Sequence, residues 1–428
     1  MNYKLMSPSQ REAEYALLRE TFQKIQSQKL SMDMSRGKPE PRQLDFGEEL
    51  LTALSHNEDC KTEEGFDVRN YGLPHGIPEV KRLFAQLTEA KESEVFIGGN
   101  SSLKLMYNVL ADACLVGFEQ SPKPWAKCDT VKFLCPAPGY DRHFSLCEHL
   151  NIEMIPIPML DDGPDMDLIE DLVSMDESIK GIWCVPKYSN PTGITFSDKT
   201  VRRFAALKPK APDFKIFWDN AYMIHDLYEE GDKLLNLLHE AKKYGNEDRI
   251  YEFGSTSKVT YAGSGIAFLA TSEKNVLWLQ RNFDLEGLGY DKINQLRHFR
   301  YLKSVENIRA IMKRHAAVLR PKFEDVLATF ERSFGDSGVA EWSKPRGGYF
   351  ISLNVLPGTA ARTFELAVQL GVTLTGVGST FPYRKDPADS NLRIAPTNVS
   401  PENVSFIAEC IAICAKMASL EKLMGICT

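Results

Sequence analysis

The residues Arg249-Ile-Tyr-Glu-Phe253, followed directly by Gly254-Ser-Thr-Ser-Lys258, set the expectations for both fold and chemistry. The first run is mostly apolar and ends at a glycine, which is typical of a buried β-strand. A lysine just beyond such a strand, among hydroxyls and glycines, can be shielded from water. Shielding lowers the pKa of its amine and frees it as a nucleophile. Taken alone, the S-x-S-K motif fits a solvated loop lysine equally well.

Four further short apolar runs have the same character and are bounded by Gly, Pro, Asn or Asp. They are residues 131–135, 181–186, 215–218 and 266–270. Helical patterns lie between them, as in residues 197–207, and this alternation predicts β-α-β units with a mostly parallel sheet. Ligands bind beyond the carboxyl ends of the strands in such sheets, so the residues after each strand are the candidates for chemistry.

The C-terminal third of the chain has a different pattern. Residues 295–332 are helical in character, with only Pro321 interrupting them. Residues 347–353 and 391–395 are typical of strands, and a final amphipathic helix is expected over residues 401–424. This mixture predicts a second, smaller α+β unit.

Length and composition agree with a globular α/β protein of this kind. The chain has 428 residues, of which 43% are hydrophobic and 25% charged, with a net charge of −7. This composition excludes collagen-like and low-complexity proteins, and the acidic balance argues against nucleic-acid binding. We predict a large α/β domain over residues 51–300 and a small α+β domain over residues 301–428, which residues 1–50 join.

The sequence also predicts a cytoplasmic protein. Its N-terminus lacks the apolar core and cleavage site of a signal peptide, and no run of 18 uncharged apolar residues predicts a membrane span. The nine cysteines are odd in number and form no C-x-x-C pair, so free thiols in a reducing compartment are expected. No Cys/His group has the spacing of zinc ligands, so no metal is expected.

Polar and aromatic residues follow three of the other predicted strands. Asp219 could cap the next helix or hold a proton on a pyridine nitrogen, with Tyr222 three residues on reaching the same ring. Asn190, in Ser189-Asn-Pro-Thr-Gly193, belongs to a turn signal. Tyr140, after Pro136-Ala-Pro-Gly139, is either a surface tyrosine or a flat ring on which a cofactor lies.

A glycine-rich turn, Gly98-Gly-Asn-Ser-Ser102, opens another helical run. Such a turn presents free backbone N–H groups and the positive end of a helix dipole, which suit a phosphate group. A phosphate site and an activated lysine in one α/β sheet point to pyridoxal 5′-phosphate (PLP) as a cofactor.

In this order the motifs resemble the fold-type I PLP-dependent aminotransferases of class I, over about Ser35 to Pro396. The motifs are Tyr71, Gly98-Gly-Asn-Ser-Ser102, Pro138-Gly-Tyr140, Asn190-Pro-Thr-Gly193, Asp219-x-x-Tyr222, Ser255-x-Ser-Lys258 and Arg393. Within the class, further phrases are similar to the bacterial aspartate aminotransferases of the Ic subgroup. These phrases are Ser35-Arg-Gly-Lys-Pro39, Asn70-Tyr-Gly72, Lys292-Ile-Asn-Gln-Leu-Arg-His298 and Leu392-Arg-Ile-Ala-Pro396.

The resemblance implies a role for each residue around the cofactor ring. Lys258 would form the internal aldimine and then move the proton during the reaction. Asp219 would keep the pyridine nitrogen protonated, so that the ring acts as an electron sink. Asn190 and Tyr222 would hydrogen-bond the phenolic oxygen of the cofactor, and Tyr140 would stack on the ring. His143 would support Asp219 from behind.

The resemblance also implies the phosphate and substrate contacts. The phosphate would be held by Ser255, Ser257 and the amides of Asn100, Ser101 and Ser102. Tyr71 resembles a tyrosine that reaches the phosphate from the neighbouring subunit, which implies a homodimer with shared active sites. Arg393 would bind the substrate α-carboxylate in a two-point pairing, with further substrate contacts from Gly37 and Asn190.

Two positions depart from the family pattern. Class I enzymes place an arginine eight residues after the lysine to neutralise the phosphate, whereas this chain has Ile266 there. Lys104 is a possible substitute, although a surface lysine explains it as well. No arginine aligns with the one that reads the distal group of a dicarboxylate. Lys292, Arg36 and Arg297 are the candidates.

The expected protein is a cytoplasmic PLP aminotransferase that moves an amino group from aspartate to 2-oxoglutarate by a ping-pong mechanism. An aminotransferase with alanine, aromatic or broad specificity would use the same cofactor residues. A PLP β-lyase would share most of them. A non-catalytic PLP-binding regulator is a further alternative, but it would carry a basic helix-turn-helix segment, which this sequence does not show.

Overall fold

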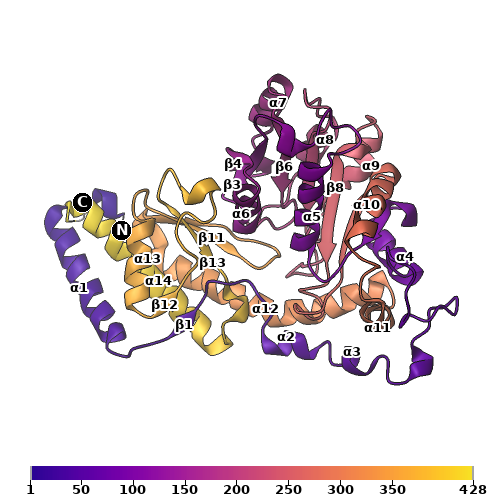
Figure 1. Ribbon diagram of the computed structural model, residues 1–428. Coiled ribbons are helices and arrows are strands. Elements are labelled where there is room, and N and C mark those ends of the chain that lie inside the picture. Colours follow the sequence, from indigo (N-terminus) through magenta and orange to yellow (C-terminus); the bar gives the residue numbers. More distant parts are fainter. Residues whose placement is uncertain (1, 427–428) are drawn as a thin grey trace.

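The computed structural model describes residues 2–426, which form a large sheet-bearing body and a smaller one (Figure 1). Within those residues the large sheet has eight strands, in the order β2-β9-β8-β7-β6-β3-β4-β5. The neighbours from β8 to β4 run parallel, while β9, β2 and β5 run antiparallel to the strands beside them. The strands are β2 (Val95–Ile97), β3 (Lys132–Ala137), β4 (Glu153–Leu160), β5 (Gly163–Pro164), β6 (Ile179–Cys184), β7 (Lys215–Asp219), β8 (Ile250–Ser255) and β9 (Ala267–Thr271). This arrangement confirms the expected α/β fold with a mostly parallel sheet.

Helices cover both faces of the large sheet, which explains why its strands are almost continuously apolar. Successive residues of a strand point to opposite faces, so Phe217 of β7 packs on one helical layer while Ile216 and Trp218 pack on the other. The first layer contains α5 (Ser102–Leu115), α6 (Asp141–His149) and α10 (Glu273–Glu286), and the second contains α7 (Met166–Met175), α8 (Asp198–Ala205) and α9 (Leu237–Lys242).

The smaller body is built from both ends of the chain. An antiparallel sheet of β10, β11 and β13 packs with α1, α13 and α14, and the short strand β1 pairs in parallel with β12. Figure 1 shows the two chain ends beside each other on this body. The elements are α1 (Pro8–Gln26), β1 (Met32–Asp33), β10 (Ala340–Trp342), β11 (Ile351–Val355), α13 (Ala360–Gln369), β12 (Val372–Thr373), β13 (Asn391–Ile394) and α14 (Pro401–Met424).

Helix α14 is the core of the smaller body. By length and apolar composition it could cross a membrane, but 72% of its most apolar window is buried inside the protein. Ala408, Ile411 and Cys414 are fully buried among the apolar side chains of α1, α12 (Val305–Phe334) and α13. The expectation that this helix is amphipathic was wrong, because it packs on several sides at once and is apolar on more than one face.

Helix α12 packs in both bodies. Ile311, in its first half, packs in one apolar cluster with Leu50 and Leu83, whereas Phe330, in its second half, packs in the cluster of the smaller body. The division of the chain at residues 50 and 300 stays a prediction. The remaining helices are α2 (Pro41–Asp45), α3 (Glu49–Thr52), α4 (Pro78–Leu87) and α11 (Lys292–Leu302).

Two further expectations about the C-terminal third were wrong in detail. The helical pattern over residues 295–332 is two helices, because Lys303 has a φ of +59° and Ser304 starts α12 by accepting a hydrogen bond from the backbone N–H of Asn307. Pro321 lies inside α12 without ending it. The strand expected from residue 347 begins at residue 351, because Gly348 has a φ of +78°, outside the extended region, and its N–H donates to the carbonyl oxygen of His225 at 2.9 Å.

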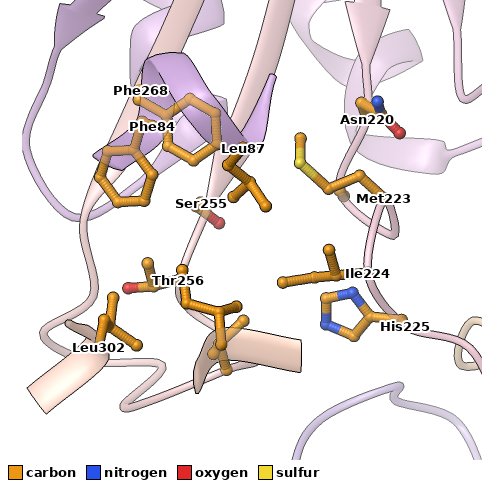
Figure 2. A pocket seen from close by; sticks show the side chains of 13 residues that line it. Phe84, Leu87, Asn220, Met223, Ile224, His225, Ser255, Thr256, Phe268 and Leu302 are labelled. Atoms are coloured by element: carbon orange, nitrogen blue, oxygen red, sulfur yellow. The ribbon is translucent and has the colours of Figure 1, made fainter. Parts of the chain in front are cut away.

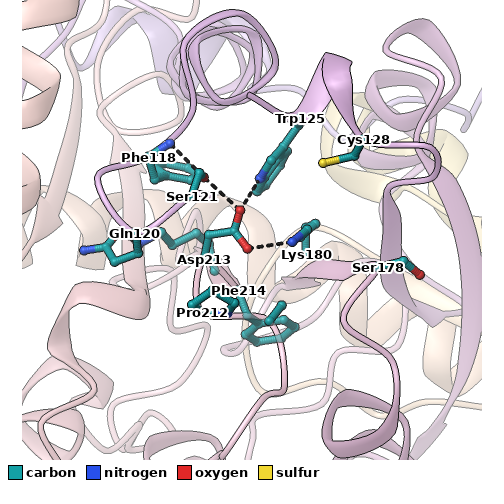
Figure 3. A network of polar contacts seen from close by, with 12 residues as sticks. Phe118, Gln120, Ser121, Trp125, Cys128, Ser178, Lys180, Pro212, Asp213 and Phe214 are labelled. Atoms are coloured by element: carbon teal, nitrogen blue, oxygen red, sulfur yellow. Dashed lines mark hydrogen bonds and ion pairs between the residues drawn. The ribbon is translucent and has the colours of Figure 1, made fainter. Parts of the chain in front are cut away.

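A buried ion pair fastens the sheet at its amino end, away from the carboxyl ends of the strands. Asp213, just before β7, accepts hydrogen bonds of 2.8 Å from Lys180 of β6 and 2.9 Å from the indole N–H of Trp125 (Figure 3). Ser121 donates a third at 2.8 Å. Burial by itself would raise the pKa of Asp213, but these donors hold it below its ordinary value. The charged form is therefore fully paired inside the protein.

The cysteines within residues 2–426 are free thiols. Most of them are buried, including Cys135, Cys184 and Cys414. Cys427 lies outside the described residues.

Candidate active site

Four neighbouring parallel strands end at the same edge of the large sheet, and each is followed by a residue singled out from the sequence. The strand β3 leads to Tyr140, β6 leads to Asn190, β7 ends on Asp219 and β8 leads to Lys258. Because the carboxyl ends of parallel strands meet at one edge, these side chains come together although they are far apart in the sequence.

The two carboxylate oxygens of the buried Asp219 are in different situations. Oδ2 accepts a hydrogen bond of 3.0 Å from Nε2 of His143, whose ring stacks on Trp183 with centroids 4.3 Å apart. Oδ1 is also buried but has no hydrogen-bond partner among the described residues. A buried carboxylate oxygen without a donor costs free energy, so this atom fits an N–H group of a bound ligand.

The amine of Lys258 lies among aromatic rings. Its Nζ is 5.0 Å from the centre of the Tyr222 ring and 5.9 Å from that of Tyr349. Burial lowers the pKa of Lys258, although the carboxylate of Asp219 acts in the opposite direction. Burial also raises the pKa of Tyr222 well above its ordinary value, so its phenol stays protonated. The site therefore offers a nucleophilic amine beside a neutral hydrogen-bond donor.

Tyr140 is a further aromatic residue at this edge. Its ring contacts that of His143 edge-on, with centroids 4.9 Å apart. Burial raises the pKa of Tyr140 to about 12, with further contributions from Asp219 and Asp141. The ring is therefore an uncharged surface next to the buried carboxylate, on which a flat ligand can stack.

Mostly apolar side chains lie beneath the turn that carries Lys258. Figure 2 shows side chains from several elements around a small cavity beneath this turn. Among these side chains, the rings of Phe84 and Phe268 stack with centroids 4.2 Å apart. The backbone N–H of Ile266 donates to Oγ1 of Thr256 at 2.9 Å, which ties the turn to the next strand. The turn that carries the lysine is thus bonded to the start of the neighbouring strand.

The loop before α5 lies against the same turn. Nδ2 of Asn100 donates to the carbonyl oxygen of Gly263 at 2.9 Å, and Oγ of Ser257 donates to the carbonyl oxygen of Asn100 at 3.3 Å. Ser101 is the N-cap of α5. Hydroxyl groups and the N-terminus of a helix therefore gather at one place, which suits a phosphate. The predicted phosphate contacts in this region are Asn100, Ser101, Ser102, Ser255 and Ser257.

Arg393 enters the site from β13 of the smaller body. Its Nη1 donates to Oδ1 of Asp141 at 2.8 Å and to Oδ1 of Asn190 at 3.3 Å. Its Nε donates to Oγ1 of Thr375 at 3.2 Å, and its guanidinium lies 4.9 Å from the centre of the Phe350 ring. The guanidinium is thus held by both bodies of the protein.

Two predicted contacts remain, Gly37 with the substrate and Tyr71 with the phosphate of a neighbouring subunit, and they lie in different surroundings. Gly37 packs on the ring of Phe350, which any side chain at that position would overlap, so it borders the support of Arg393. Tyr71 lies on the surface and is 76% exposed.

Known proteins are similar to this chain in sequence and in fold. A family profile described as "Aspartate amino-transferase" matches residues 6–426. The chain belongs to this aspartate amino-transferase family. An aspartate aminotransferase of Corynebacterium glutamicum is 43% identical over 404 residues, which cover 94% of this chain and 93% of that protein.

Solved structures of other aminotransferases have the same fold. The crystal structure of an aspartate transaminase from Corynebacterium glutamicum superposes with a TM-score of 0.96 at 41% identity, covering 99% of each chain. The α-aminoadipate aminotransferase of Thermus thermophilus, solved with N-(5′-phosphopyridoxyl)-L-leucine, superposes with a TM-score of 0.75. It is 18% identical and covers 93% of this chain and 94% of that one, a likeness of fold alone.

In this family member, Ile266 occupies the position at which a phosphate-binding arginine was expected, and that position belongs to the core. Ile266 is 1% exposed and packs with Ile97, Phe268 and Leu296 between α4, α11 and the sheet edge. A charged side chain there would be buried among apolar groups. The absence of an arginine at this position therefore follows from its place in the core, and the predicted phosphate contacts are hydroxyl and N–H groups.

The other candidate cations lie on three different segments. Arg36 follows Ser35, whose carbonyl oxygen accepts a hydrogen bond of 2.7 Å from Thr375, so Arg36 belongs to the segment beside Arg393. Its side chain is exposed.

Lys292 and Arg297 instead belong to α11. There Asn294 donates to the carbonyl oxygen of Gly265, next to the lysine turn. Lys104 is exposed on α5 with its ammonium 4.6 Å from the centre of the Tyr107 ring. None of these three lies on the segment that borders Arg393.

Sequence reasoning missed three residues that contact Arg393, namely Asp141, Thr375 and Phe350. Asp141 adjoins the Pro138-Gly-Tyr140 motif, so an acidic residue beside a motif was a usable signal. Thr375 and Phe350 lie in segments without any motif, and only folding brings them to the site.

Replacing Ile266 by arginine tests whether this position is part of the core. We expect the free energy of unfolding to fall by roughly 3 kcal/mol or more, because the charge would be buried without a partner. Urea denaturation measures this loss, with Ile266→Val as the matched control at about 0.5–1.5 kcal/mol. An arginine variant that keeps its stability and binds PLP more tightly than the parent would refute this interpretation.

Proposed function

We propose that this protein is a PLP-dependent aminotransferase that moves the amino group of aspartate to 2-oxoglutarate in the cytoplasm. The observation that carries the proposal is Oδ1 of Asp219, which has no hydrogen-bond partner within residues 2–426 and lies near an amine of lowered pKa on Lys258. A pyridine N–H satisfies the first group, and an aldehyde reacts with the second. PLP carries both groups and a phosphate.

The residues present fit this cofactor at three places. Asp219 would hold the proton on the ring nitrogen, supported by His143. Asn190 and Tyr222 would hydrogen-bond the phenolic oxygen, and Tyr140 would stack on the ring. The hydroxyls and amides of Asn100, Ser101, Ser102, Ser255 and Ser257 would hold the phosphate. When bound, PLP supplies an electron sink for the carbanion formed at the substrate Cα.

The protein's own part in the reaction is binding, orientation and proton transfer. Arg393 would bind the substrate α-carboxylate through a two-point pairing and so direct the Cα–H bond toward Nζ of Lys258. The lowered pKa of Lys258 favours the neutral form of its amine, which lets Nζ accept and return a proton. The protonated phenol of Tyr222 can donate a hydrogen bond throughout.

Aspartate is favoured as the substrate by the relative named as an aspartate aminotransferase, which is 43% identical along nearly the whole chain. Arg36 is the candidate for the distal carboxylate, because it follows a residue bonded to Thr375, and Thr375 holds Arg393. An aminotransferase of alanine, aromatic or broad specificity is the second candidate.

A homodimer with shared sites is the proposed assembly. Tyr71 and Leu288 are exposed on loops, and Leu285 and Ile293 are exposed at the adjoining ends of α10 and α11. The loop that carries Tyr71 is joined to α10 by a 2.7 Å hydrogen bond between His75 and Asp284. A second copy would cover these side chains and receive Tyr71 at its phosphate site.

Half-transamination with a panel of amino acids tests the reaction and its substrate. The PLP-loaded protein should show an absorbance band that shifts fastest with aspartate and glutamate. Lys258→Ala should slow the reaction on the order of 10⁴-fold, because it removes the proton carrier. Lys199→Ala, an exposed lysine on α8, should change nothing.

The outcomes of this panel separate the alternatives. Equal or faster reaction with alanine or phenylalanine would replace the aspartate assignment by a different specificity. Release of ammonia and a 2-oxo acid without cofactor conversion would indicate a β-lyase. A protein that takes up no PLP would refute the proposal as a whole.

Mixing two inactive variants tests the shared site. In a hybrid of Tyr71→Ala and Lys258→Ala subunits, one site has both changes and the other has neither. Equal mixing should therefore restore about one quarter of the wild-type active sites, since half of the dimers are hybrids. Hybrid dimers that form without any gain in activity over the parents would show that each site uses its own Tyr71.

A further inference from the structure

The guanidinium of Arg393 is already paired with a carboxylate of the protein. Oδ1 of Asp141 lies 2.8 Å from Nη1 of Arg393, and the two side chains are 29% and 8% exposed. Asn190 also accepts a hydrogen bond from this Nη1, at 3.3 Å, but unlike Asp141 it carries no charge.

Two further parts of the guanidinium, Nε and one face, are also in contact with the protein. Nε donates to Thr375, and one face covers the ring of Phe350. A substrate carboxylate that binds in a two-point pairing must therefore bind at the edge of the guanidinium formed by Nη1 and Nη2. Asp141 holds Nη1 of that edge, so the incoming carboxylate encounters a negative charge at its own binding position.

We propose that Asp141 is an internal counter-ion that competes with the substrate carboxylate for Arg393 and thereby sets the affinity of the enzyme for its amino and oxo acids. The inference rests on the proposed function, since it takes Arg393 as the carboxylate site.

The position of Asp141 allows it to make and to release this contact. It is the first residue of α6, so its carboxylate remains stabilised by the N-terminus of its own helix after Arg393 is taken. Without substrate, the pair keeps the largely buried Arg393 from lying uncompensated inside the protein. Asp141 thus lowers the cost of an empty site and weakens the binding of a carboxylate to it.

The same ion pair could instead act only as a tie between the two bodies, because Arg393 lies on β13 and Asp141 on α6. The two roles predict opposite effects on ligand binding. Removing a competitor strengthens carboxylate binding, whereas removing a support misplaces Arg393 and weakens it.

Asp141→Asn separates these roles, because asparagine has the same shape and its oxygen still accepts from Nη1. The dissociation constant of succinate, an unreactive dicarboxylate, is measured by calorimetry on the PLP-loaded enzyme. We expect it to fall roughly tenfold, which corresponds to about 1.4 kcal/mol. In the half-reaction, KM for aspartate should fall while kcat stays the same. Glu148→Gln removes one exposed charge from the same helix and is the matched control.

An unchanged or larger dissociation constant in Asp141→Asn would overturn the inference. In an Arg393→Lys background, the change at Asp141 should lose most of its effect, and a full effect there would also overturn it. The proposed function fails separately. A wild-type enzyme that binds succinate but transaminates no amino acid would refute the reaction while the succinate comparison still tests Asp141.

Discussion

The carboxylate of Asp219 lies buried at the end of the central strand β7, with one oxygen bonded to His143 and the other without a partner among the described residues. The rest of the site depends on this arrangement. Burying a charge is costly unless it is paired, so the fold must supply a donor or a ligand must do so. His143, held flat on Trp183, supplies one donor. We propose that the ring nitrogen of PLP supplies the other.

Positive charge has to be gathered locally in this acidic protein, and the structure brings it from two directions. Lys258 comes from the large sheet and Arg393 from the smaller body, so the site exists only where the two bodies meet. Asp141 and Asn190 hold Arg393 from the large body, while Thr375 holds it from the smaller one. Affinity for a substrate carboxylate is then a balance between these groups and the carboxylate itself.

Much of this was predictable from sequence, because the signals are local. The five apolar runs became strands, and the helix expected over residues 401–424 has those bounds. Polar residues after the strands lie together because parallel strands end at one edge. The break before α12 was missed because it depends on one residue with positive φ and an N-cap. The contacts of Thr375 and Phe350 with Arg393 join distant segments, which no local pattern reveals.

The protonation state of the cofactor ring nitrogen tests directly whether Asp219 has the role proposed for it. The protein can be loaded with PLP carrying ¹⁵N at the ring position, and the nitrogen chemical shift then reports whether a proton is bound. The proposed role of Asp219 predicts a protonated nitrogen at neutral pH in the wild type and a neutral one in Asp219→Asn, because only the carboxylate stabilises the charged form. A neutral ring nitrogen in both proteins would contradict it.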